Sequence, residues 1–275
     1  MDEVKGTDEI PRESEGAGAT LTLAANFLSP ENILQWLTYP LFPEVPGHIT
    51  VSFIAFGEIP LLFCTKGMVL RLPAVEGEAY QLKGQTAPFN TNLAIRKDAE
   101  GYFFKGILLG ETADYSIRKE GRSFAVVGDT GKFRTNYRIT SMEEGFDLEG
   151  DTGQYNSKVL ITPEGKGYAV RGLLESKKID LSLFEEEGKY HYQGTVEGAS
   201  HDIVVEQETP SIINVSGPQC SLRTEFQIMG ENNEVRITGA FRGVKGHLTV
   251  TLEEVIIHVA GGFDTSRVGY SITKA

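Results

Sequence analysis

Glycine recurs along this chain about every 22 residues, and this spacing limits the fold more than any other feature of the sequence. The glycines stand at positions 84, 106, 128, 150, 172, 194, 217, 239 and 261. Seven of the eight intervals are 22 residues, and the interval from Gly194 to Gly217 is 23. A fixed period of this length is typical of a repeat architecture in which each repeat is one supersecondary unit.

Each repeat contains two short stretches in which apolar and polar residues alternate. The first ends at the glycine, as in YFFKG, FDLEG and YAVRG. The second lies 11 to 13 positions earlier, at pairs such as Leu93/Ile95 and Val159/Ile161. Alternation with a period of two is typical of a strand with one buried face. Since 22 residues cannot hold two strands and a crossover helix, the strands must be antiparallel.

The predicted fold is therefore all-β: an antiparallel up-and-down meander of about 18–20 strands built from 22-residue hairpin repeats. We expect it to form a curled sheet or a flattened barrel, with one short N-terminal helix. Polar, glycine-bearing stretches between the strands, such as KDAEG and EEEGK, are the expected hairpin turns. In the 23-residue unit the strand pair is Ile203/Val205, so the extra residue should follow Val205, near Pro210. Tyr270 and Ile272 fit the beginning of a tenth, truncated unit.

The N-terminal region differs from the repeats. Residues 1–20 are acidic and polar, as in a flexible leader, and residues 21–275 are predicted to form a single β-repeat domain. A helix is expected near 30–39, because Ser29 can cap it, Pro30 suits its first turn and Pro40 ends it. Apolar strands are expected within 48–72, and hairpin repeats from about 70 to 275.

The repeat glycines are at an even offset from the apolar residues that precede them, so they belong to the apolar face. A line of glycines across that face has two uses. It allows the sheet to bend sharply, or it leaves a trough where a ligand or another segment approaches the backbone. The bend is the favoured interpretation.

The net charge and the targeting signals limit the partners and cellular locations that can be expected for this protein. The formal net charge is −12, which argues against a nucleic acid or an anionic membrane as the main partner. The N-terminus has no secretory signal, so a cytoplasmic location is expected, and no apolar stretch is long enough for a transmembrane helix. Cys64 and Cys220 have no metal-like spacing and are expected to be reduced.

Nothing in the sequence indicates catalysis, a metal site or a cofactor. Asp-Thr-Gly occurs at Asp129–Gly131 and at Asp151–Gly153, and it resembles the catalytic loop of aspartic proteases. Both copies follow a repeat glycine at the same phase, however, and the triplet also suits a turn. His191 and His258 share a repeat phase three units apart and should lie on the polar face, too distant to share a metal. We therefore expect a protein that is not an enzyme.

The apolar face supplies the functional hypothesis. An open sheet of this size would expose far more apolar area than a monomer tolerates, so something must cover that face. We expect a non-catalytic binding protein that holds an apolar ligand, such as a lipid or pigment, against the apolar face of a curled sheet. The alternative is a structural or scaffold protein that acts through self-association as a homo-oligomer or through partner docking. The candidate ligand-binding residues are Trp36, Phe53, Phe56, Tyr102, Phe124, Phe146, Tyr168 and Tyr190.

Overall fold

The structure is a computed structural model that describes most of the chain from residue 79 onward. The described residues are 79–275 except 109, 132, 175, 220–221, 242, 254–255 and 265, together with four short strands at 20–23, 41–42, 48–51 and 68–73. These residues contain no helix. The helix predicted near 30–39, most of the predicted leader and both cysteines lie outside them.

Twenty-two strands are described. The first four are β1 (Thr20–Leu23), β2 (Leu41–Phe42), β3 (His48–Val51) and β4 (Met68–Pro73). The next nine are β5 (Ala79–Thr86), β6 (Phe89–Asp98), β7 (Gly101–Leu108), β8 (Glu111–Glu120), β9 (Ser123–Thr130), β10 (Phe133–Ser141), β11 (Phe146–Thr152), β12 (Tyr155–Glu164) and β13 (Gly167–Leu174). The last nine are β14 (Lys177–Glu186), β15 (Lys189–Val196), β16 (Ala199–Thr209), β17 (Ile212–Gln219), β18 (Leu222–Glu231), β19 (Glu234–Phe241), β20 (Val244–Glu253), β21 (Ile256–Phe263) and β22 (Ser266–Lys274).

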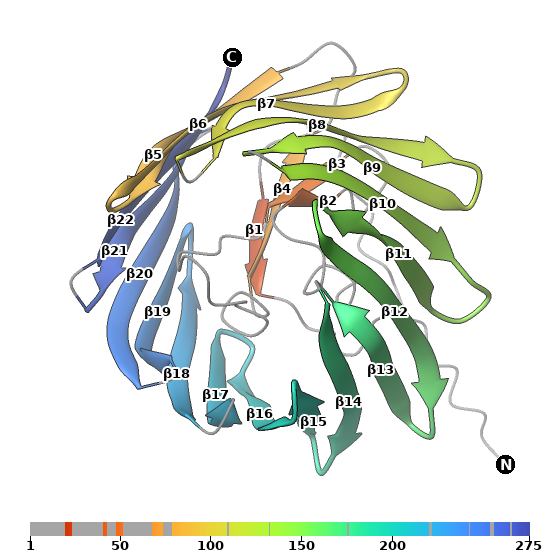
Figure 1. Cartoon of the computed structure of the whole chain (residues 1–275). Coiled ribbons are helices and arrows are strands. Elements are labelled where there is room, and N and C mark those ends of the chain that lie inside the picture. Colours follow the sequence, from red (N-terminus) through yellow and green to blue (C-terminus); the bar gives the residue numbers. More distant parts are fainter. Residues whose placement is uncertain are drawn as a thin grey trace, which may run out of the picture.

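Strands β5 to β22 form one closed antiparallel barrel of 18 strands (Figure 1). Each strand pairs with its neighbours in sequence, and β22 pairs with β5 to close the ring. The predicted antiparallel meander is thus confirmed, and the sheet closes. The expected truncated tenth unit is β22, which supplies the missing partner of β5.

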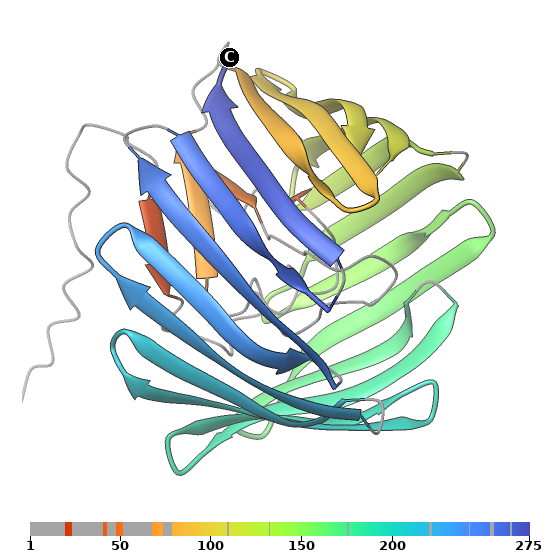
Figure 2. The ribbon, with the colours of Figure 1, turned by 90° about the vertical axis from the view of Figure 1, so that its left-hand side faces the viewer.

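The four N-terminal strands form a separate antiparallel sheet in the order β1-β4-β3-β2. Both views place this small sheet within the outline of the barrel wall (Figures 1 and 2). Strand β3 and most of β4 fall in the range 48–72, where apolar strands were predicted. A long wall therefore surrounds a short inner sheet.

The barrel wall has one apolar face and one polar face, because side chains alternate along each strand. Apolar side chains of one face form a continuous buried cluster, in which Leu93, Ile161 and Val250 have no exposed surface. The opposite face carries exposed charges such as Lys105 and Arg171. The face with the exposed charges is the outside of the closed ring, because water reaches it. The buried apolar face therefore lines the interior.

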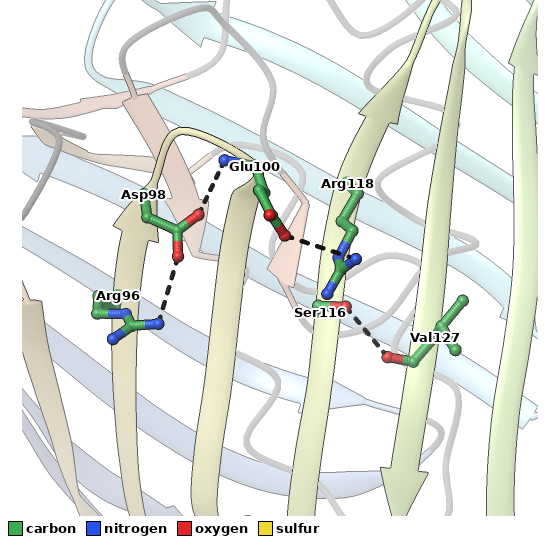
Figure 3. Close-up of polar contacts among 6 residues, drawn as sticks. All are labelled: Arg96, Asp98, Glu100, Ser116, Arg118 and Val127. Carbon is green, nitrogen blue, oxygen red and sulfur yellow. Dashed lines mark hydrogen bonds and ion pairs between the residues drawn. The ribbon is translucent and has the colours of Figure 1, made fainter.

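Cross-strand ion pairs cover the outer face. Lys105 Nζ lies 3.0 Å from a carboxylate oxygen of Asp114, its register partner, and Arg171 Nε lies 3.3 Å from Asp180. Figure 3 shows a similar group at the ends of β6 to β8, where Glu100 contacts Arg118 at 3.6 Å. Exposed pairs of this kind stabilise a protein by only about 0–1 kcal/mol each. Their main effect is to keep this face in water.

The 23-residue unit accommodates its extra residue as predicted. The pairing of β16 with β17 is regular up to Gln207 and shifts between Gln207 and Thr209. The bulge comes after Val205, so the residues before it keep the alternation of the other repeats. Ile203 and Val205 are therefore fully buried, like their counterparts in other repeats.

Among the described residues, no helix has the length and apolar character needed to cross a membrane.

Candidate functional site

Aromatic side chains form a belt around part of the inner wall. Each stands four residues before a repeat glycine, so the repeat places them at equivalent points of successive odd-numbered strands. The belt consists of Tyr80, Tyr102, Phe124, Phe146, Tyr168 and Tyr190. Five of these were predicted as ligand-binding residues, and the fold brings them to one level of one face. Of the other predicted residues, Trp36, Phe53 and Phe56 lie outside the described part of the chain.

Each belt residue packs beside an aliphatic residue of the following strand. Tyr102 is the register partner of Ile117, and Phe146 is the partner of Ile161. Aromatic side chains beside β-branched ones are among the favourable cross-strand pairs. Tyr102 and Phe146 are buried, whereas Tyr168 is only partly buried. The belt is therefore well packed in places and more open in others.

The repeat glycines form bends rather than a trough. At Gly172, φ is +136°, and a Cβ atom there would lie 1.9 Å from the carbonyl oxygen of Lys158 on the neighbouring strand. At Gly106 the corresponding distance, to the Asn92 oxygen, is 2.1 Å. The space that a side chain would occupy is filled by neighbouring backbone. The glycines thus permit the curvature of a closed wall, and a ligand cannot approach along them.

Small polar side chains lie next to the glycines on the inner face. Each follows a repeat glycine by seven residues and pairs directly with a repeat glycine of the preceding strand. They are Thr91, Thr135, Ser157, His201 and Thr224, all at most 8% exposed. Each has an interaction partner. These polar positions on the inner face were not predicted from the sequence, because the alternation pattern identifies only the apolar residues of that face.

Gln219 is the distinctive member of this region. It lies directly across from His201, on β17, and is only 2% exposed. Its side-chain oxygen Oε1 has no hydrogen-bond partner. His201 Nδ1 lies 3.4 Å from the carbonyl oxygen of Ala199. An unsatisfied buried acceptor costs about 1–3 kcal/mol, so an O–H or N–H group of a ligand at this point would be stabilised.

Two hollows lie in the described part of the barrel. A shallow groove of about 1450 Å³ crosses β18 to β22, and Arg236, Lys245, His247 and Arg267 line it together with several glycines. A smaller hollow of about 570 Å³ lies between the turns near Glu143 and Lys166. Two belt residues, Phe146 and Tyr168, line the smaller hollow, whereas no belt residue lines the larger groove.

The motifs that resembled catalytic or metal sites lie on the outer face. Asp129 and Asp151 are on β9 and β11, which β10 separates, and they pair with β10 residues two positions apart. About 12 Å therefore separates them, and they cannot share a proton. Gly131 and Gly153 form the adjoining turns, with φ near +60°. His191 stacks on Phe184, and His258 lies 3.9 Å from Glu253. The described residues contain no group of three potential metal ligands.

Comparison with known proteins gives no further assignment: no family model, curated protein or solved structure matches this chain.

Proposed function

We propose that this barrel is a non-catalytic binding protein that holds an apolar ligand, of the lipid or pigment class, between its inner wall and the small inner sheet. The observation that carries the proposal is the apolar interior of so wide a ring. Side chains of the wall fill the interior of an eight-stranded barrel, whereas barrels of 16 to 18 strands enclose a lumen. An 18-stranded ring of tilted strands has a diameter of roughly 36 Å.

The lining of this interior selects the ligand. Wide barrels that enclose water have polar lumens, but here the inward residues are aromatic or aliphatic over most of each strand. Sheets pack about 10 Å apart, so the small inner sheet can lie against only part of the wall at one time. The partly buried belt residues Phe124, Tyr168 and Tyr190 keep accessible area, and a ligand that covers them would gain about 25 cal/mol for each Å² of apolar surface removed from water.

The polar side chains next to the glycines indicate how a ligand would be oriented. Gln219 Oε1 lacks a donor, and His201 lies across from it, whereas the belt beyond is apolar. A ligand with an apolar body and one hydroxyl or amide group fits both regions. Its polar end would face Gln219, and its apolar part would lie along the belt.

The test begins with what co-purifies with the full-length protein. Native mass spectrometry and solvent extraction should find an apolar molecule in stoichiometric amount. Val159→Trp places a larger side chain on the inner face, and it should reduce the bound amount at least tenfold. Leu160→Trp is the matched control, because Leu160 is the next residue, is 42% exposed and points outward. A ligand-free, stable monomer, or equal loss in both variants, would contradict the proposal.

The second candidate is a scaffold that acts through its outer surface. Leu160 and Leu173 favour it, since they lie on adjacent strands and are 42% and 43% exposed. Closure of the ring weighs against self-association through strand edges, because β5 and β22 are paired with each other. Light scattering distinguishes the two: a ligand-bound monomer favours the first candidate, and a ligand-free oligomer favours the scaffold.

A further inference from the structure

The two ends of the barrel have different chemistry. Because the strands alternate in direction, all nine even-numbered strands from β6 to β22 begin at one end and finish at the other. The odd-numbered strands from β5 to β21 run the opposite way, so they finish where the even-numbered strands begin. We call these ends the start rim and the finish rim, and each is defined by the two terminal residues of all 18 barrel strands at that end. At the start rim, the even-numbered strands begin with Phe89, Glu111, Phe133, Tyr155, Lys177, Ala199, Leu222, Val244 and Ser266.

Charge is divided unequally between the two rims. The start rim carries six basic and three acidic residues, and the finish rim carries four basic and ten acidic residues. The basic residues of the start rim are Arg134, Lys177, Lys178, Arg223, Lys245 and Arg267. The protein has an overall charge of −12, but its start rim carries more basic than acidic residues.

Large apolar side chains are exposed at the same rim. Phe89 is 48% exposed, Leu222 47%, Leu173 43%, Tyr155 41% and Val244 37%. They account for five of the seven large hydrophobic residues that are exposed in the described part of the chain. Exposed apolar side chains scattered singly over a surface are ordinary, but the gathering of most of them at one end of the barrel marks that end as a candidate contact surface.

Most of the basic residues of this rim are available to a partner. Arg223 pairs with Glu225 at 2.5 Å, but Arg134, Lys178, Lys245 and Arg267 are exposed and form no ion pair with another residue that the structure describes. On the wall, in contrast, cations such as Lys105 and Arg171 are paired with carboxylates. Lys245 and Arg267 also line the shallow groove beside the rim, together with the carboxylates Glu225 and Asp264.

We propose that the start rim docks on the surface of an anionic lipid bilayer, with the acidic finish rim directed away from it. Exposed aromatic and aliphatic side chains insert at the level of the lipid headgroups, and Lys and Arg beside them attract anionic lipids. The start rim presents both features on one end of the molecule. This placement does not depend on whether the interior holds a ligand.

Vesicle flotation of the full-length protein tests the proposal. Vesicles of pure phosphatidylcholine are compared with vesicles that contain 30% phosphatidylserine. We expect binding to the anionic vesicles alone, and loss of it in 0.5 M NaCl because salt screens the charges. Lys178→Glu/Lys245→Glu/Arg267→Glu should reduce binding on the order of 100-fold. Tyr155→Ser/Leu222→Ser should also weaken it, through lost apolar contact.

Matched variants elsewhere on the barrel provide the controls. Lys83→Glu/Arg122→Glu/Lys166→Glu makes the same change of net charge at exposed positions outside the start rim. Val127→Ser/Leu160→Ser removes similarly exposed apolar side chains from the middle of the wall. Both controls should bind as the unaltered protein does, with circular dichroism confirming that every variant is folded. Absence of binding to either vesicle, equal binding to both, or equal loss in rim and control variants would overturn the proposal.

Discussion

Tyr270 lies directly across from Gly84, so the last strand of the chain completes the first repeat. A Cβ atom on Gly84 would lie 2.1 Å from the Gly269 oxygen and 2.6 Å from Tyr270 Cα. Gly150 shows the same contacts with Asn136 and Tyr137 inside an ordinary hairpin. The closing pair of strands therefore reproduces the geometry of a repeat, although some 185 residues separate its two members. Closure through this pair removes both edges of the sheet.

The repeat glycines should tolerate no side chain. Gly172→Ala places a methyl group where the Lys158 oxygen lies, at a φ of +136°, and should destabilise the barrel by about 3 kcal/mol or more. Gly165→Ala is the control, because φ there is +62° but nothing lies within 4 Å of the added atom. Its expected cost is about 1 kcal/mol. Urea unfolding of the two variants measures the difference, and equal costs would contradict the role of the glycines as bends.

The extra residue of the 23-residue unit should be dispensable. The bulge lies at Glu208, which is exposed and accepts a hydrogen bond of 2.9 Å from Asn214. Deleting Glu208 restores the 22-residue period and should change stability by less than about 1 kcal/mol. Deleting Val204 instead shifts the following residues to the wrong face and should prevent folding. If both deletions fold equally well, the inferred register is wrong.

Tyr192 should make the fold sensitive to alkali. Its side chain is fully buried, and burial raises the pKa of Tyr192 well above the ordinary value of 10.0. Electrostatic interaction with the nearby Tyr190 raises this pKa further, by a smaller amount. A raised folded-state pKa gives stability that is present below pH 10 and lost as pH rises beyond it. Above pH 10 this one group should lower stability by about 1.4 kcal/mol per pH unit.

Denaturant unfolding between pH 8 and pH 11 measures this dependence. Tyr192→Phe should reduce its slope, whereas Tyr155→Phe, at a residue that is 41% exposed, should leave the slope unchanged. An unaltered slope in Tyr192→Phe would show that Tyr192 titrates alike in the folded and unfolded protein.

The strands could be predicted from the sequence because the same alternation of apolar and polar residues, ending in a glycine, recurs nine times. The alternation around Tyr102 and Phe146 sufficed to place both on one face, and the interval from Gly194 to Gly217 located the bulge. Apolar periodicity, however, does not distinguish a curled sheet from a closed ring. That difference depends on the pairing of β22 with β5, which no local pattern encodes.

Part of the candidate site could not be predicted in the same way. The even offset of Gly172 identifies its face, but only three-dimensional pairing places the Lys158 oxygen in the space that had suggested a trough. His201 and Gln219 stand in different strands and at different repeat phases, so nothing in the sequence joins them. The charge difference between the rims was present in the sequence, but it emerges only when the strand ends are known.

Disulfide cross-linking across the closing strands tests the central claim most directly. Lys83 and Ser271 are register partners, so a Lys83→Cys/Ser271→Cys variant, with Cys64 and Cys220 replaced by Ser, should oxidise to an intramolecular disulfide in a monomer. His258 lies one strand farther along, about 9.6 Å from Lys83, so Lys83→Cys/His258→Cys should not cross-link. A monomer that forms only the first disulfide is the result expected of the closed barrel. Failure of that pair to cross-link in a folded monomer, or cross-links only between molecules, would show that the ring is open.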